Sequence, residues 1–181
     1  MSSFARTTSG SDSAPLQGYC PYATALMTTR LLFVCLGNIC RSPSAENIMN
    51  HLIEQRQLGD RISCDSAGTA SYHVGSAPDR RMNAAARRKG MTLTGSARQF
   101  TAADFEKFDL ILAMDRSNYR DILALDSGNH EYKVKLMCEF CSAHSDEEVP
   151  DPYYGEDKGF DYVIELLLDA CEGLLAEVAA R

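Results

Sequence analysis

The sequence lacks three features that would place the protein in a specialised class: an excess of basic residues, a long apolar run and a dense set of cysteines. It has 18 basic and 25 acidic side chains, so its formal net charge is −7. This argues against a general nucleic-acid binder, because affinity for the phosphate backbone needs clustered Lys and Arg. The apolar helical pattern over residues 160–178 is interrupted by charges, so we expect no transmembrane segment. The seven cysteines are spread along the chain, which indicates reduced thiols in a cytoplasmic protein.

The chain divides into a short N-terminal extension and one domain. Residues 1–29 hold ten Ser or Thr and few large apolar residues, so we expect a disordered extension. It lacks the pattern of a secretory signal, while an organellar transit peptide and a translation start at Met27 are alternatives that the sequence leaves open. Residues 30–181 form the expected domain. Apolar residues make up 45% of the chain, which is enough to bury a full core.

Strand-like and helix-like patterns alternate along this domain. Apolar runs typical of strands occur at 31–34, 61–65, 108–114 and 134–138, and helical patterns occur at 43–53, 79–89, 115–125 and 160–178. The alternation predicts an α/β fold of three layers, with about four parallel strands in a twisted sheet and helices on both faces. Ligands of such sheets bind beyond the carboxyl ends of the strands, near the first strand–helix turn.

That first turn carries the sequence Cys35-Leu36-Gly37-Asn38-Ile39-Cys40-Arg41-Ser42. The backbone N–H groups of such a loop and of the following helix converge on an anion, and Gly37 and Asn38 tolerate the unusual backbone angles of a tight loop. Arg41 can donate two hydrogen bonds to phosphate oxygens. The same positive field favours the thiolate of Cys35, which can attack phosphorus in line, while Ser42 can donate to its sulfur. The sequence therefore predicts a phosphate-binding loop after the first strand.

This loop resembles the signature of the low-molecular-weight protein tyrosine phosphatases. The resemblance extends from Leu31 to about Val178, and three further segments match: 65–69 (Asp-Ser-Ala-Gly-Thr), 108–118, and 151–155 (Asp-Pro-Tyr-Tyr-Gly). It implies hydrolysis of phosphotyrosine in proteins through a cysteinyl-phosphate intermediate, without metal or cofactor. The serine of the first of these segments, Ser66, would hold Asn38 and support the loop.

The resemblance also assigns the chemical roles. Cys35 is implied as the nucleophile, Arg41 as a phosphate ligand beside the loop amides, and Asp151 as the general acid and then the general base. The acidic run 146–148 would favour the protonated form of Asp151.

Other residues are implied around the mouth of the cleft. Tyr153 and Tyr154 would wall it and stack on an aryl substrate, and Leu36 and Ile39 would face the opening. In the family, a bulky aliphatic residue at the position of Ile39 accompanies phosphotyrosine preference, whereas Thr there marks phosphoarginine phosphatases. Tyr72 lies where the family varies a cleft residue that tunes substrate choice.

The remaining cysteines leave alternatives open. Cys40 lies in the phosphate-binding loop, and family members with this second cysteine form a reversible disulfide with the nucleophile; a packing role is an equal alternative. Cys138 and Cys141 suggest metal or redox chemistry, with His144 and His130 as further ligands. The favoured interpretation is two strand-end cysteines.

Two basic clusters, at 80–81 and 87–89, are expected to form a solvated helix face; an attraction for acidic phosphopeptides is the alternative. We expect phosphotyrosine-containing proteins as partners, no nucleic acid or membrane, and a monomer or weak dimer.

Three other functions stay open: an arsenate reductase on the same fold, a phosphoarginine phosphatase, and a phosphoprotein-binding module with a degenerate site. The segment 151–155 favours the phosphatase over the reductase, and Ile39 disfavours phosphoarginine. Intact Cys35, Arg41 and Asp151 argue against the binding module.

Overall fold

The computed structural model describes residues 28–153 and 157–180. Its four strands are β1 (Thr29–Cys35), β2 (Ile62–Gly68), β3 (Leu110–Ala113) and β4 (Val134–Leu136). The α-helices are α1 (Arg41–Gln55), α2 (Arg80–Arg88), α3 (Asp104–Lys107), α4 (Arg116–Leu123) and α5 (Asp157–Ala179), and two 3-10 helices are η1 (Glu131–Lys133) and η2 (Met137–Phe140). The α/β class predicted from the alternation is confirmed.

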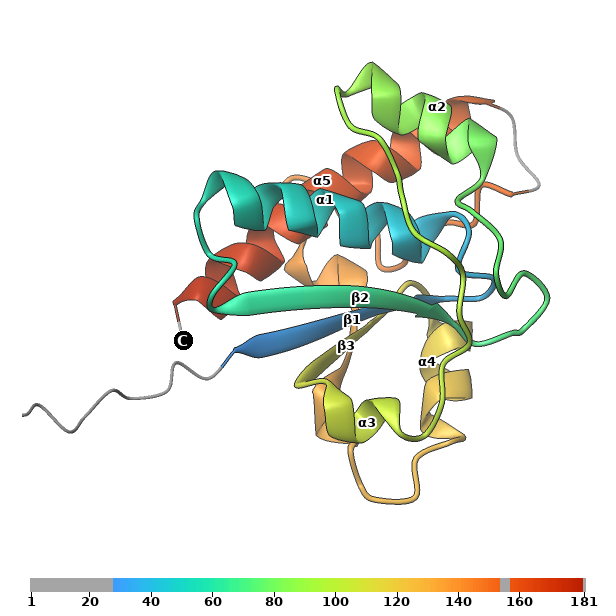
Figure 1. The fold of residues 1–181 in the computed structure, drawn as a ribbon, viewed down its shortest axis with the longest axis vertical. Helices are drawn as coiled ribbons and strands as arrows, with labels where there is room; N and C mark the ends of the chain where they lie inside the picture. Colours follow the sequence, from blue (N-terminus) through green and yellow to red (C-terminus); the bar gives the residue numbers. More distant parts are fainter. Residues whose placement is uncertain (1–27, 154–156, 181) are drawn as a thin grey trace, which may run out of the picture.

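The sheet has the strand order β2-β1-β3-β4, and every neighbouring pair is parallel. The central strand β1 points alternate residues into two cores. Leu31 and Phe33 pack against α1 and α5, whereas Leu32 and Val34 pack on the other face against α3 and α4. Figure 1 shows these helices as layers above and below the sheet. The expected three-layer arrangement, with helices on both faces, is therefore present.

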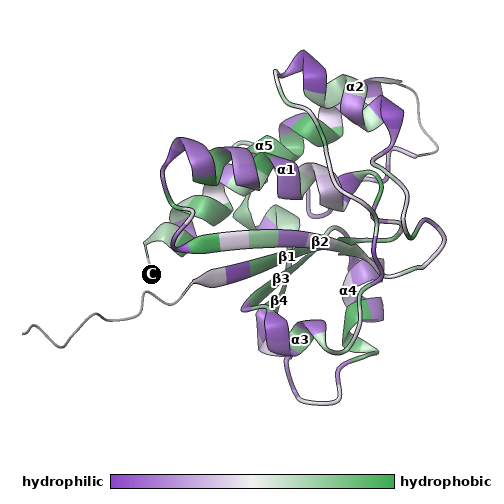
Figure 2. Ribbon diagram, viewed as in Figure 1, coloured by the Kyte–Doolittle hydropathy of each residue, from purple (hydrophilic) through white to green (hydrophobic). Residues whose placement is uncertain are grey.

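The helices differ in how much of their surface is apolar, and this decides their place in the layers. In Figure 2, α5 is coloured largely hydrophobic, while α2 and α3 show hydrophilic turns on the outside of the molecule. The apolar stripe of α5 includes Phe160, Ile164 and Leu167, all buried; it packs against α1 and carries α2 on its outer side. None of the described helices is both long and apolar enough to cross a membrane.

The loops at the carboxyl ends of the strands are tied to one another. The Thr69 N–H donates to the carbonyl of Cys35 and the Ala70 N–H to that of Leu36, each at 2.9 Å. Gly68 ends β2 beneath the same loop, and a Cβ at Gly68 would lie 2.8 Å from the Leu36 carbonyl oxygen. Only glycine therefore allows β2 to approach the loop after β1 so closely.

Two strand boundaries differ from the sequence prediction for reasons that the hydrogen bonds show. β1 begins at Thr29, inside the expected extension, because the Thr29 N–H donates to the Arg61 carbonyl at 2.8 Å; the rest of that extension, apart from Thr28, lies outside the described residues. The strand predicted for 134–138 ends at Leu136. Glu139 accepts a hydrogen bond from the Leu136 N–H at 2.8 Å, which draws the following residues into η2 rather than into the sheet edge.

Candidate active site

The phosphate-binding loop lies where the sequence predicts it, between the end of β1 and the start of α1. Cys35 is the last residue of the strand and Arg41 the first of the helix. Asn38, buried within the loop, has a φ of 54°, a left-handed conformation that Asn tolerates better than most residues. No side chain caps the N-terminus of α1, and no acidic residue occupies its first turn. Its free N–H groups and positive dipole end therefore form an anion site.

A backbone N–H and a hydroxyl face the sulfur of Cys35. The hydroxyl, of Ser42, also lies 3.2 Å from the Ala67 carbonyl oxygen, to which it can donate. The backbone N–H of Asn38 donates to Sγ at 3.3 Å, and the Ser42 hydroxyl lies 3.1 Å from it. The Ser42 hydroxyl also receives a hydrogen bond from the Asn38 amide at 2.9 Å. Hydrogen bonds of this kind stabilise negative charge on sulfur, both in the free thiolate and in a sulfur that leaves phosphorus.

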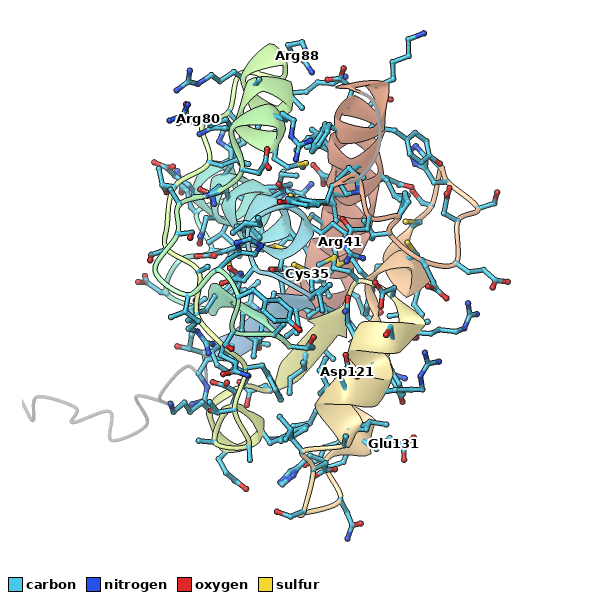
Figure 3. All side chains as sticks on the ribbon, turned by 90° about the vertical axis from the view of Figure 1, so that its right-hand side faces the viewer. Cys35, Arg41, Arg80, Arg88, Asp121 and Glu131 are labelled. Atoms are coloured by element: carbon cyan, nitrogen blue, oxygen red, sulfur yellow. The ribbon has the colours of Figure 1, made fainter. Side chains whose placement is uncertain are left out.

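Arg41 is buried and held by three oxygen atoms. Its Nη1 donates to Asp115 Oδ2 at 2.6 Å and to the Val149 carbonyl at 3.1 Å, and its Nη2 donates to Asp151 Oδ2 at 3.1 Å. Figure 3 places the Arg41 side chain directly beside Cys35 at the end of the sheet. The two carboxylates fix the plane of the guanidinium, so its donors are oriented before an anion arrives.

A hydrogen-bond chain behind the loop supports its strained residue. The Asn38 amide donates to the Ser66 hydroxyl at 2.8 Å, and the Ser66 hydroxyl donates to Glu46 Oε2 at 2.6 Å. The Asn38 side-chain oxygen Oδ1 accepts from the backbone N–H of Arg98 at 2.8 Å. The Asn38–Ser66 contact expected from the resemblance is therefore present, and it continues into α1 through Glu46. Burial raises the pKa of the Glu46 carboxyl above its ordinary value.

The loop opens into a cavity of about 130 Å³. It is lined by Cys35, Leu36, Gly37, Ile39, Cys40, Arg41, Tyr72, Asp151 and Tyr153, all singled out from the sequence, and by His73. The rings of His73 and Tyr153 face each other across 6.3 Å between centroids. Aromatic rings thus line one side of the cavity, the Arg41 guanidinium lies beside the sulfur, and the Asp151 carboxylate completes the lining. Tyr154, expected in the same wall, lies outside the described residues.

The acidic run before Asp151 does not surround it as expected. Glu147 and Glu148 pair with Arg116 at 2.8 and 2.5 Å, and Asp146 accepts a hydrogen bond from Tyr162. The charge in contact with Asp151 is instead that of Arg41. The expectation followed distance along the chain, whereas the turn before Asp151 directs these side chains to α4 and α5.

Four residues of the site were missed by sequence reasoning. Asp115 was predicted only as a helix start, which it is, since its Oδ1 accepts from the Asn118 N–H at 2.7 Å; its other oxygen holds Arg41. Glu46, Arg98 and His73 carried no recognisable signal. Arg98 and His73 reach the loop and its cavity from distant parts of the chain, and Glu46 reaches the loop only through Ser66, so no local motif encodes these contacts.

Cys138 and Cys141 stand apart from this cavity. They lie in η2 and just after it, not at a strand end as expected, and both are free thiols. His144 bonds to Asp169, and His130 to Asp126. Within residues 28–153 and 157–180, no three His, Cys, Asp or Glu side chains are arranged to hold a metal ion.

Comparison with known proteins agrees with this geometry. The low molecular weight phosphotyrosine protein phosphatase family model matches residues 30–181. A Synechocystis protein that carries the name low molecular weight protein-tyrosine-phosphatase is 59% identical over 150 residues, which cover 82% of this chain and 96% of that protein. The human low molecular weight phosphotyrosine protein phosphatase is 37% identical over 151 residues, or 82% of this chain and 94% of the human protein.

Solved structures agree as well. The crystal structure of a protein tyrosine phosphatase from Entamoeba histolytica superimposes with a TM-score of 0.82 at 44% identity, covering 84% of this chain and 98% of that one. Matches of this extent reach well beyond the phosphate-binding loop and include the whole sheet. The chain therefore belongs to the low molecular weight phosphotyrosine protein phosphatase family.

Proposed function

We propose that this protein hydrolyses phosphotyrosine in other proteins through a cysteinyl-phosphate intermediate, with Cys35 as nucleophile. One observation carries the proposal: the Cys35 sulfur lies in a cavity where the Asn38 N–H, the Ser42 hydroxyl and the N-terminus of α1 all direct positive charge at it, beside the oriented guanidinium of Arg41. A phosphate dianion drawn to these donors sits above the sulfur.

In the first step, the Cys35 thiolate attacks phosphorus and the bond from phosphorus to the tyrosine oxygen breaks. The Asp151 carboxyl donates its proton to the departing phenolate. Arg41 and the amides of residues 36–41 hold the three equatorial oxygens, on which charge is spread in the transition state. No metal takes part in this step.

In the second step, water attacks phosphorus and the sulfur–phosphorus bond breaks. The Asp151 carboxylate accepts a proton from that water, which returns it to the acid form. Ser42, 3.1 Å from the sulfur, donates its hydroxyl hydrogen bond to the departing thiolate. The products are inorganic phosphate and free enzyme.

The cavity walls account for an aryl substrate. Tyr153 and Tyr72 are 37% and 82% exposed at the opening, and an aromatic ring passing between them gains stacking and apolar contact. The aliphatic Ile39 contributes to the same lining, which fits phosphotyrosine rather than phosphoarginine.

Arsenate reduction is not favoured. An arsenate reductase on this fold needs further cysteines that carry a disulfide outward. Of the described cysteines, only Cys35 and Cys40 line the cavity, and Cys138 and Cys141 lie in and after η2.

Two properties of the enzyme follow from the thiols. The six described cysteines are all free, which supports a reducing location such as the cytoplasm. Cys40, in the same cavity as Cys35, is the proposed partner in a reversible disulfide that protects the nucleophile.

Residues 30–181 are the proposed phosphatase domain, acting as a monomer or weak dimer.

The test is steady-state hydrolysis of a phosphotyrosine peptide in the presence of a metal chelator. Phosphoserine and phosphoarginine peptides are the controls, and Cys35→Ser is the matched variant. We expect turnover of phosphotyrosine alone, abolished by the substitution. Turnover that survives Cys35→Ser would overturn the mechanism, and phosphoarginine hydrolysis at a similar rate would overturn the substrate class.

A further inference from the structure

The helix beside the catalytic cavity is strongly basic in an acidic protein. α2 contains Arg80, Arg81, Arg87 and Arg88, it ends against Lys89, and no acidic residue lies within it. Its buried face consists of Met82, Ala85 and Ala86. The basic side chains therefore face outward, although the chain as a whole carries a net charge of −7. Nothing in the proposed chemistry uses this charge.

Only part of that charge is neutralised. Arg81 pairs with Asp79, Arg88 with Asp161 and Lys89 with Glu165, at 2.6 to 3.0 Å. Among the described side chains, no acidic group lies within ion-pairing distance of the other two arginines, at positions 80 and 87. The Arg88–Asp161 pair is about half exposed, and exposed pairs exchange readily for another anion because they contribute little stability.

Three of the arginines surround a hollow on the protein surface. This hollow, of about 240 Å³, is lined by Arg80, Arg81, Ala84, Arg88 and Phe160, and is called the α2 hollow below. Its floor is the exposed side chain of Ala84, because the Phe160 ring is 1% exposed and the Arg81 guanidinium carbon lies over it, 4.6 Å from the ring centroid. Its rim consists of guanidinium groups. This combination suits a carboxylate on a short aliphatic stem: the stem contacts the floor, and the planar guanidinium forks match the carboxylate oxygens.

The α2 hollow adjoins the catalytic cavity through one contact. The Arg81 guanidinium carbon lies 5.3 Å from the Tyr153 ring centroid, and Arg81 Nη1 donates to the Tyr153 carbonyl at 3.3 Å. Tyr153 lines the catalytic cavity and Arg81 lines the α2 hollow. A peptide whose phosphotyrosine enters the cavity beside Tyr153 thus carries a neighbouring side chain toward the arginines.

Figure 3 shows the same arrangement across the whole face. Cys35 and Arg41 lie between Arg80 and Arg88 on one side and Asp121 and Glu131 on the other. Arg80 and Arg88, which line the α2 hollow, therefore lie on the opposite side of the catalytic loop from Asp121 and Glu131.

We propose that the α2 hollow is a specificity subsite that binds the carboxylate of an acidic residue flanking the phosphotyrosine of a protein substrate. This rests on the proposed function, because it concerns the same reaction and deepens its substrate class. Charge complementarity selects the occupant: an acidic segment gains contact with two arginines of the rim, Arg80 and Arg88, without displacing the Arg81–Asp79 pair.

The experiment compares kcat/KM for phosphotyrosine peptides that differ in one residue. Glu, Gln or Lys is placed at each position within about three residues on either side, since an extended strand advances about 3.3 Å per residue. We expect Glu at one or two positions to exceed Gln by about five- to tenfold, and Lys to be the poorest. This preference should shrink as salt is added.

Two variants locate the effect. Arg80→Gln, and the double variant with Arg88→Gln, should reduce the preference for Glu to within about twofold. Arg87→Gln removes the same charge from the same helix, but Arg87 does not line the hollow, so it should retain the preference. Phenyl phosphate should be hydrolysed equally by all four proteins, because it carries no carboxylate that the α2 hollow could bind.

Three other outcomes would contradict the proposed subsite, and a fourth would contradict the proposed function. Equal kcat/KM for Glu and Gln peptides in the wild type, or an equal loss in Arg87→Gln, shows that no local site exists. A phosphoserine in place of Glu that gives a larger preference assigns the hollow to a second phosphate instead of a carboxylate. Failure to hydrolyse phenyl phosphate would contradict the proposed function itself, which separates the two failures.

Discussion

Arg41 and Asp151 form an ion pair across the mouth of the cavity, with Nη2 of the arginine 3.1 Å from Oδ2 of the aspartate. The arginine side chain is almost fully buried and the aspartate is about one-third exposed. The proposed phosphate ligand and the proposed general acid are therefore in contact before substrate binds. Phosphate entering the loop competes with Asp151 for the same guanidinium donors, which would free the carboxyl to serve the leaving group.

The first prediction concerns this pair. Asp151→Asn removes the acid and also removes a negative charge next to the bound phosphate. We expect kcat/KM on a phosphotyrosine peptide, which reports the steps up to departure of the phenolate, to fall by roughly 10²–10⁴-fold, while inorganic phosphate inhibits more strongly. The loss should be smaller on p-nitrophenyl phosphate, because its phenolate leaves without protonation. Equal losses on both substrates would remove Asp151 from the role of general acid.

The second prediction separates the two functions of Asp115. One carboxylate oxygen caps α4 and the other holds Arg41. Asp115→Asn keeps the cap, since Asn is an equally good N-cap. Its Nδ2 replaces the oxygen that accepts from the buried Arg41, so the free energy of unfolding should fall by about 1–3 kcal/mol from that lost pairing alone. kcat/KM should nevertheless fall by about tenfold or more, because Arg41 loses a charged partner that orients it.

Asp115→Ala provides the control for this prediction. It removes the cap as well, so urea denaturation should show a lower stability than for Asp115→Asn, with a similar loss of activity. If Asp115→Asn retains wild-type kcat/KM, the Val149 carbonyl and Asp151 suffice to orient Arg41.

The third prediction follows from the buried carboxyl of Glu46. Its pKa is raised above the ordinary 4.5 mainly by burial. A group whose pKa is raised by folding stabilises the fold at pH values below its unfolded pKa, and that contribution is lost as pH rises through the folded pKa. Glu46→Gln keeps an oxygen that accepts from Ser66 but has no proton to lose. Its stability relative to the wild type should therefore increase from pH 4.5 upward.

Urea denaturation at a series of pH values measures this difference. Parallel stability curves for the two proteins would show that Glu46 titrates alike in the folded and unfolded states. Ser66→Ala tests the other end of the chain: it removes the hydroxyl that donates to Glu46 and accepts from one N–H of the Asn38 amide, which should cost about 1–3 kcal/mol.

The sequence predicted the phosphate-binding loop well because the loop is contiguous. Cys35, Arg41 and Ser42 lie within eight residues, so a single motif carries both their identity and their geometry. The fold was predictable for a similar reason: apolar runs and helical periods are local patterns, and their alternation allows few topologies. Elements of three or four residues, such as α3 and η1, were missed because they are too short to show a period.

The partners of the loop were not predictable in this way. Asp115 meets Arg41 across 74 positions of chain, and Arg98 meets Asn38 across 60. Such contacts depend on which strand ends adjoin one another, so they appear only once the order β2-β1-β3-β4 is known. The prediction that the acidic run at 146–148 surrounds Asp151 was wrong for the opposite reason: these residues are close to Asp151 in sequence, but their side chains pair with other elements.

The last prediction concerns the second thiol of the loop. Burial, together with the nearby Asp79 carboxylate, raises the pKa of Cys40 from 9.0 to about 12. At pH 7.5 its thiolate fraction is therefore far smaller than that of an ordinary thiol, and alkylating reagents react with the thiolate. In the Cys35→Ser variant, iodoacetamide should leave Cys40 unmodified for as long as the protein stays folded.

Mass spectrometry can check this directly. Trypsin releases residues 31–41 as one peptide that contains both cysteines, so fragmentation of that peptide locates the label. In the wild type, we expect the label on Cys35 and protection by inorganic phosphate. Rapid labelling of Cys40 in Cys35→Ser would contradict its protonated state.

The protonated state of Cys40 also sets the order of steps in the proposed disulfide formation. Peroxide must first oxidise Cys35 to the sulfenic acid, and the Cys40 sulfur then attacks the Cys35 sulfur and displaces water. Cys40→Ser should consequently leave turnover intact but make inactivation by peroxide irreversible.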